Sequence, residues 1–95
     1  MAVTLTPLEK AHLKARAHAL EPVVRVGQAG VTARLVAEVE RALTAHELIK
    51  VRIDDGDRDR RAAAATEICV STDAALVHRV GKIAILWRPR PVDEE

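Results

Sequence analysis

The sequence predicts an α/β domain in which three helices and four strands follow the order α-β-α-β-α-β-β. Apolar residues recur with helical spacing in three segments and with strand spacing in four, and the two kinds of segment alternate along the chain. The last two strand-like segments are separated only by Gly81, which favours an antiparallel hairpin. We therefore expect a two-layer sandwich, with helices packed on a mixed four-stranded sheet that contains at least one parallel pair.

The first helix is expected to begin directly after Thr6. Thr6 can cap the helix, Pro7 fits its first position, and Glu9 completes a T-x-x-E capping box. A core stripe at i, i+4 and i+7 consists of Leu13, Ala17 and Leu20. A basic stripe repeats every four residues on a neighbouring face and consists of Lys10, Lys14 and His18, with Arg16 and His12 further round. Pro22 is expected to end this helical region.

A short strand, a glycine turn and a second helix follow. The strand is predicted over residues 23–26, and the turn is bounded by Gly27 and Gly30. Thr32 is a suitable cap for a helix that runs to about residue 45. Its buried stripe is expected to consist of Leu35, Val39, Ala42 and Leu43, and its water-facing residues are Arg34, Glu38 and Arg41.

The rest of the chain completes the sheet. Residues 48–53 alternate apolar with basic side chains, which predicts a half-buried strand, and residues 54–57 form a turn. A helix is expected over 58–71, with Ala62, Ala65, Ile68 and Cys69 facing inward. Two more strands are predicted over 76–80 and 82–88. The last one is apolar on both faces, Trp87 included, so we expect it to be central.

Length and composition indicate one small domain over residues 1–95, with an ordered core at about 5–89 and a loose tail at 90–95. Residues 1–53 carry eight Lys and Arg against five Asp and Glu, whereas residues 54–95 carry seven against nine. A mild basic bias therefore surrounds the glycine turn. No apolar run approaches the ~20 residues of a membrane helix. The lone cysteine, Cys69, cannot form an internal disulfide, which favours a cytoplasmic setting.

The sequence offers no pattern typical of catalysis or metal binding. Four histidines and one cysteine lack zinc spacing, and residues 54–61 lack the glycine and glutamate of an EF-hand. A single aromatic residue excludes a binding mode that depends on several stacking rings. We expect no cofactor, no metal and no small-molecule substrate, and we expect a monomer.

The G-x-x-G turn of Gly27, Gln28, Ala29 and Gly30 carries the functional prediction. Each glycine allows a close backbone approach, and the following helix directs unpaired N–H groups and the positive end of its dipole at the turn. A phosphate suits such a site. A third glycine for a dinucleotide fingerprint and a Lys-Ser/Thr pair for a Walker loop are missing. A notch for a nucleic-acid backbone remains, as in KH domains. The alternative is a tight connection without a ligand.

Basic side chains from elsewhere are expected to support the turn. If the first helix packs beside the turn, Lys10, Lys14 and His18 flank the notch. Arg16 and Arg34 are further candidates for contacts with a nucleic-acid backbone.

Three motifs in the same order resemble those of the CRM domain, a family named for chloroplast RNA splicing and ribosome maturation. Residues 13–32 carry the pattern L-K-x-x-A-H-x-L-x-P-V-V-x-V-G-x-x-G-V-T. Residues 46–51 carry H-E-L-I-K-V, and residues 81–89 carry G-K-x-x-x-L-W-R-P. Trp87 stands where tyrosine is more usual, and Gln28-Ala29 brings no charge into the loop. The resemblance covers about residues 5–89 and is to the free-standing, YhbY-like bacterial members.

This resemblance implies a fold similar to the C-terminal domain of translation initiation factor three, and RNA binding without catalysis. Single-domain bacterial relatives are associated with precursors of the large ribosomal subunit. The glycine loop of the family maps onto residues 27–30, and its basic helix surface maps onto Lys10, Lys14 and His18.

The leading hypothesis is an RNA-binding protein that assists large-subunit assembly by binding ribosomal RNA precursor. Its expected RNA-binding residues are Lys10, Lys14, Arg16, His18, Gly27, Gln28, Ala29, Gly30 and Arg34. The alternative is a protein–protein adaptor that docks on ribosomal proteins and contacts RNA only incidentally. A third class, a small enzyme that uses the acidic residues at 54–59, is the least supported.

Overall fold

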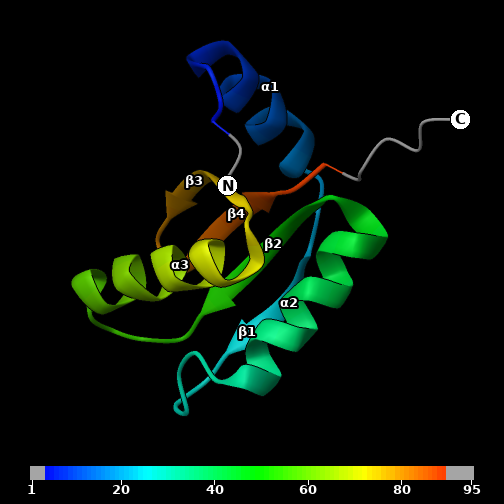
Figure 1. Ribbon diagram of the computed structural model, residues 1–95. Coiled ribbons are helices and arrows are strands. Elements are labelled where there is room, and N and C mark those ends of the chain that lie inside the picture. The colour runs from blue at the N-terminus through cyan, green and yellow to red at the C-terminus, as the bar shows by residue number, and fades with distance from the viewer. Residues whose placement is uncertain (1–3, 90–95) are drawn as a thin grey trace, which may run out of the picture.

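The computed structural model describes residues 4–89 and confirms the predicted order of elements (Figure 1). The elements are α1 (Pro7–Ala17), β1 (Pro22–Val26), α2 (Ala33–His46), β2 (Leu48–Ile53), α3 (Arg58–Thr72), β3 (Ala75–Val80) and β4 (Ile83–Trp87). The predicted tail at 90–95 lies outside the described residues. Within residues 4–89, no helix combines the length and the apolarity that crossing a membrane requires.

The sheet is mixed, with the strand order β1-β2-β4-β3. β1 and β2 are parallel because α2 carries the chain back between them, whereas β4 is antiparallel to both of its neighbours. The expected central position of the last strand is confirmed, since Ala84 pairs with Val51 on one side and with Arg79 on the other. β1 is an edge strand, and its first residue, Pro22, has no N–H to leave unpaired.

Helix starts follow the capping residues in the sequence. Thr6 and Glu9 form the complete capping box of α1. The Thr32 hydroxyl accepts a hydrogen bond from the amide of Leu35 at 3.1 Å. At α3, the carboxylate of Asp57 accepts hydrogen bonds from the first-turn amides. These three caps explain why the starts of all three helices agree with prediction.

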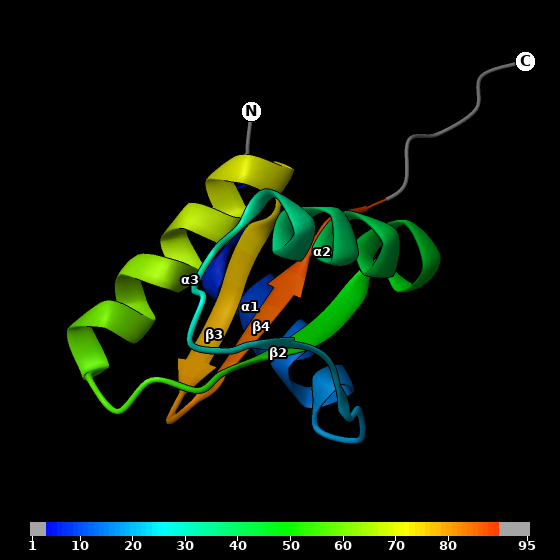
Figure 2. The same cartoon turned by 90° about the horizontal axis from the view of Figure 1, so that it is seen from below.

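The main core lies between the sheet and the helix pair α2–α3. It is built from alternate residues of β1 and β2 and from the inward stripes of the two helices, and its fully buried members include Val39, Leu43, Ile49, Val51 and Ile68. Figure 2 shows α2 and α3 on the same side of the strands. The expected helix-on-sheet packing is formed by this pair.

Helix α1 packs on the opposite face of the sheet and so forms a third layer beyond the two that were expected. Leu13 and Ala17 are buried there against residues of β2, β3 and β4. The helix ends at Ala17, where the chain turns with the amide of Leu20 bonded to the carbonyl of Ala17. The predicted third member of the core stripe, Leu20, therefore lies beyond the helix and is 37% exposed. Trp87, expected in the core, is half-buried beside this smaller cluster.

The two faces of α3 predict unequal effects of truncation. Ile68→Ala should lower the free energy of unfolding by about 2–5 kcal/mol, because Ile68 is fully buried and its loss leaves a cavity. Val70→Ala, on the exposed face of the same helix, should change it by no more than about 0.5 kcal/mol. Urea unfolding followed by the fluorescence of the single tryptophan measures both variants. Equal losses would contradict this orientation of α3.

Candidate nucleic-acid interface

The glycine loop projects from the end of β1 and is open to solvent. Gly27, Gln28 and Ala29 are exposed, and the amide of Gly30 closes a turn on the carbonyl of Gly27 at 3.1 Å. Gly30 has φ of +74°, a conformation that side chains disfavour. A Cβ added at Gly27 or Gly30 would meet no atom within 4 Å. The space above both glycines is therefore free for a ligand.

The first turn of α2 adds to the positive character of this loop. The amide of Leu35 donates a hydrogen bond to Thr32, the N-cap of α2, and the positive end of the helix dipole lies at this end of α2, which follows the loop in the chain. The first turn of α2 carries no acidic residue, in contrast to Glu9 in α1 and Asp59 in α3. Arg34 occupies an exposed position in this turn. An anion that approaches the loop therefore meets no carboxylate from the first turn of α2.

The turn between β2 and α3 lies beside the glycine loop and brings two carboxylates near it. Asp54 and Asp55 line the same hollow of about 310 Å³ as Gly27 and Gly30. The amide of Asp54 bonds to the carbonyl of Val26 at 3.0 Å, which ties the two connections together. The loop is thus not covered by the rest of the domain, but it does have acidic neighbours.

Arginines neutralise both of these carboxylates. Asp54 is ion-paired with Arg25 and, at 2.7 Å, with Arg52, and Asp55 is paired with Arg60 at 3.0 Å. The Arg25 guanidinium first, and Arg52 second, hold the pKa of the Asp54 carboxyl below its ordinary value of 3.8. Hydrogen bonds from Arg60, and then from the backbone of Asp57, lower the pKa of Asp55 in the same way.

The charge around the loop is therefore balanced rather than acidic. The pairing arginines and the segment 54–61 together contain five arginines, namely Arg25, Arg52, Arg58, Arg60 and Arg61, and four aspartates, namely Asp54, Asp55, Asp57 and Asp59. Arg34 adds a further positive charge on α2. Arginine side chains that are partly exposed beside their carboxylates remain able to reach a phosphate.

The structure separates the basic stripe of α1 from the glycine loop. Lys10, Lys14 and His18 are exposed on α1, as predicted, and Arg16 is exposed as well. Figure 1 shows α1 at one end of the molecule and the loop after β1 at the other. The expectation that α1 flanks the notch is therefore not met. The reason is that β1 starts near the end of α1 and runs away from it.

The face of the sheet that carries α1 connects these two places with further basic residues. Arg25, Lys50 and Arg52 alternate with the buried residues of β1 and β2, so their side chains leave the opposite face of the sheet from α2 and α3. Lys14, His18, Lys50 and His78 line a groove of about 260 Å³ between α1 and this face. In the pairing of β1 with β2, Lys50 lies beside Pro22. Arg52 lies beside Arg25, at a position nearer to the glycine loop.

Sequence reasoning missed these sheet residues as candidates. The alternation of Lys50 and Arg52 with apolar residues did show that both leave the same face of one strand. The ion pair between Arg25 and Asp54 joins residues 29 apart in the chain, and no local pattern signals it. It depends on the register between β1 and β2, which only the folded sheet provides.

Metal binding and thiol chemistry find no support in the described residues. Within residues 4–89, no group of three or more His, Cys, Asp or Glu side chains could hold a metal ion. Burial raises the pKa of the Cys69 thiol to about 11, so at neutral pH the group is a thiol and not a nucleophilic thiolate.

Comparison with known proteins gives consistent matches over nearly the whole chain. The family model described as the CRS1/YhbY (CRM) domain matches residues 5–88. A protein of Haemophilus influenzae named RNA-binding protein is 43% identical over 86 residues, which are 90% of this chain and 87% of that protein. A protein of Pseudomonas aeruginosa named a probable RNA-binding protein is 40% identical over 89 residues, which cover 94% of this chain and 86% of the other.

A solved structure supports the fold. The solution structure of a hypothetical protein from Staphylococcus aureus superposes with a TM-score of 0.83 at 24% sequence identity. The match covers 96% of this chain and 95% of the other. The arrangement of helices and strands described above is therefore shared with an experimentally determined structure.

The arginine pairs of Asp54 predict an acid dependence of stability. The pKa of Asp54 is lower in the folded chain than in the unfolded one, so the stability from this pairing is complete above pH 3.8 and is lost as the pH falls through the folded pKa. Asp54→Asn should therefore be less stable than the wild type at pH 7, and the gap should close in acid. Urea midpoints across the pH range measure it. A gap that stays constant down to acid pH would contradict the pairing.

Proposed function

The chain belongs to the CRS1/YhbY (CRM) domain family, and on that premise we propose that it binds RNA through the glycine loop 27–30 and a basic surface beside it. Two relatives with at least 40% identity carry names that describe RNA binding, and each is matched over most of its length. The role is a binding one, without catalysis.

The observation that carries this proposal is the exposed turn with a glycine at each end, which precedes the positive end of α2. Gly30 can keep its φ of +74° without strain, and a Cβ added at Gly27 or Gly30 would meet no atom within 4 Å. Backbone amides and a helix dipole bind a phosphate without a charged side chain in the loop. The neutral pair Gln28-Ala29 is therefore compatible with the function.

The basic sheet face extends the interface from the loop towards α1. Arg25 and Arg52 lie next to the loop, and Lys50, Lys14 and His18 follow in the direction of α1. An RNA strand that crosses this face would contact the loop and the helix stripe in turn, although the two do not adjoin. Phosphate contacts of this kind orient a strand without specifying its sequence.

We further propose that the RNA is a precursor of the large-subunit ribosomal RNA and that the protein acts as a monomer. The resemblance to single-domain bacterial CRM proteins supports the first point. The proposed setting is the cytoplasm, where a lone buried thiol such as Cys69 stays reduced.

A charge placed in the loop tests its role. Gly30→Asp should weaken binding to a protein-free transcript of large-subunit precursor RNA by about tenfold or more, because the added carboxylate repels a phosphate held at the loop. Gly81→Asp is the matched control. It adds the same charge at a glycine with φ of +56°, in the hairpin between β3 and β4, which β2 separates from β1, and should lower the affinity much less than Gly30→Asp does.

Thermal unfolding shows whether both glycine variants remain folded. Equal affinities of a folded Gly30→Asp protein and the wild type would remove the loop from the interface. Binding that requires ribosomal proteins to be present would favour the adaptor function instead.

Salt dependence tests the basic sheet face. If the protein contacts about three phosphates of a single RNA strand, the logarithm of affinity should fall with the logarithm of the salt concentration at a slope near −2. Lys14→Ala and Lys50→Ala should each make that slope shallower by about 0.7, the contribution of one phosphate on a single strand. Arg41→Ala, on the exposed side of α2, should leave the slope unchanged. Identical slopes for all three variants would contradict a strand that crosses this face.

A further inference from the structure

A second concave site lies at the start of β1, away from the glycine loop. It is a pocket of about 360 Å³ between the end of α1, the end of α2 and the first residues of β2. Its walls are aliphatic and consist of Leu20, Val23, Leu48 and Ile49. Leu20 and Val23 are 37% and 52% exposed, whereas Leu48 and Ile49 are buried, so the pocket opens to solvent at Leu20 and Val23. Pockets of this size and character accept a small, mostly apolar group.

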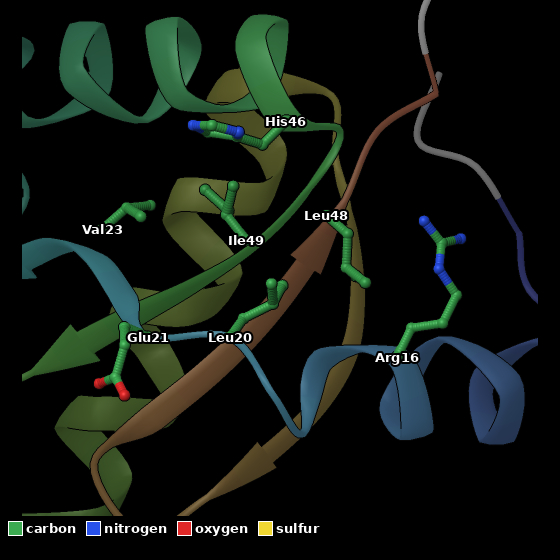
Figure 3. Close-up of a pocket in the computed structure, with 7 residues that line it drawn as sticks. All are labelled: Arg16, Leu20, Glu21, Val23, His46, Leu48 and Ile49. Carbon is green, nitrogen blue, oxygen red and sulfur yellow. The ribbon is translucent and has the colours of Figure 1, made fainter.

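Polar side chains stand only at the edges of this pocket. Figure 3 shows the guanidinium of Arg16 on one side of the aliphatic group and the imidazole of His46 on the other, close to Ile49. The carboxylate of Glu21, which also lines the pocket, is turned away from the other labelled side chains. Arg16 has donors only, and His46 offers at least one more. The pocket thus combines aliphatic walls with hydrogen-bond donors at its edges.

We propose that this pocket receives an unpaired nucleobase of the RNA that the glycine loop binds, an inference that rests on the proposed function. A nucleobase has two apolar faces, which match the aliphatic walls, and an edge with hydrogen-bond acceptors, which matches the donors of Arg16 and His46. The lone aromatic residue of the chain, Trp87, does not line the pocket. Aliphatic walls and the planar Arg16 and His46 would take the place of aromatic stacking.

The position of the pocket allows one RNA strand to reach it from the loop. Val23 lies at the start of β1, and Gly27 follows directly after its end, so the two sites are about 13 Å apart along an edge strand. Arg25 lies between them and is largely exposed. One RNA strand that runs along this edge of the sheet could therefore place a phosphate in the loop, contact Arg25 and place a base in the pocket.

A peptide side chain fits this pocket less well than a base does. An aliphatic side chain from a partner protein would contact the aliphatic walls but would form no hydrogen bond with Arg16 or His46, whose exposed donors would stay bonded to water. A phosphate would use the donors but would gain nothing from the aliphatic walls. A nucleobase uses both features at once.

The test compares RNA with and without bases. The probes are a short single-stranded oligoribonucleotide and a chain of abasic ribose phosphates of the same length. The wild type should bind the intact strand at least about fivefold more tightly than the abasic one. Val23→Glu places a carboxylate in the pocket and should bring this ratio close to one, whereas Val70→Glu adds the same charge on the exposed face of α3 and should leave the ratio unchanged. Because both probes carry the same phosphates, the added carboxylate repels them equally, and this repulsion does not change the ratio.

The outcomes separate this inference from the function on which it rests. Equal binding of the two probes by the wild type, or an unchanged ratio in a folded Val23→Glu protein, would overturn the pocket and leave backbone binding intact. Failure of the wild type to bind either probe would overturn the proposed function itself. Leu20→Ala, which shortens one wall without adding charge, should lower the ratio partially. This second variant tests the pocket if the Val23→Glu protein does not fold.

Discussion

The packing of α2 across the parallel pair β1–β2 is the interaction on which the rest of the structure depends. Val24 and Val26 of β1 share a core with Leu35 and Val39 of α2, so the chain must reverse direction between the strand and the helix. That reversal takes place in residues 27–32. The requirement for a positive φ at Gly30 and the exposure of the loop both follow from it. The candidate phosphate site is thus a consequence of how the main core is assembled.

The same packing determines the electrostatics around the loop. Parallel pairing brings the ends of β1 and β2 together, and with them Arg25 and the acidic turn that begins at Asp54. Carboxylates beside a phosphate site would repel RNA if they were unpaired. Their pairing with Arg25, Arg52 and Arg60 removes most of that repulsion and leaves exposed guanidinium groups beside the loop. The acidic turn orders arginines near the interface and so need not oppose binding.

The parts of this fold that local chemistry determines could be predicted from the sequence. The capping residues Thr6 and Thr32 place two helix starts, and the alternation over residues 48–53 gives the bounds of β2. The strand order and the side of the sheet that α1 covers depend on long-range packing, so no local pattern contains them. Leu20 shows the limit clearly: its spacing continues the helical stripe, but the helix ends three residues earlier and the side chain becomes a pocket wall. The candidate loop was predictable, whereas its arginine neighbours and its distance from α1 required the folded sheet.

The most direct test of the central claim is a titration of the labelled protein with single-stranded RNA, followed by the backbone amide resonances. We expect the largest shifts at residues 27–31 and at the start of α2, with smaller shifts along β1 and on the basic side of β2. The exposed face of α3 should not respond. Shifts confined to α3 or to the outer side of α2, with the amides of Gln28 and Ala29 unmoved, would contradict RNA binding at the glycine loop.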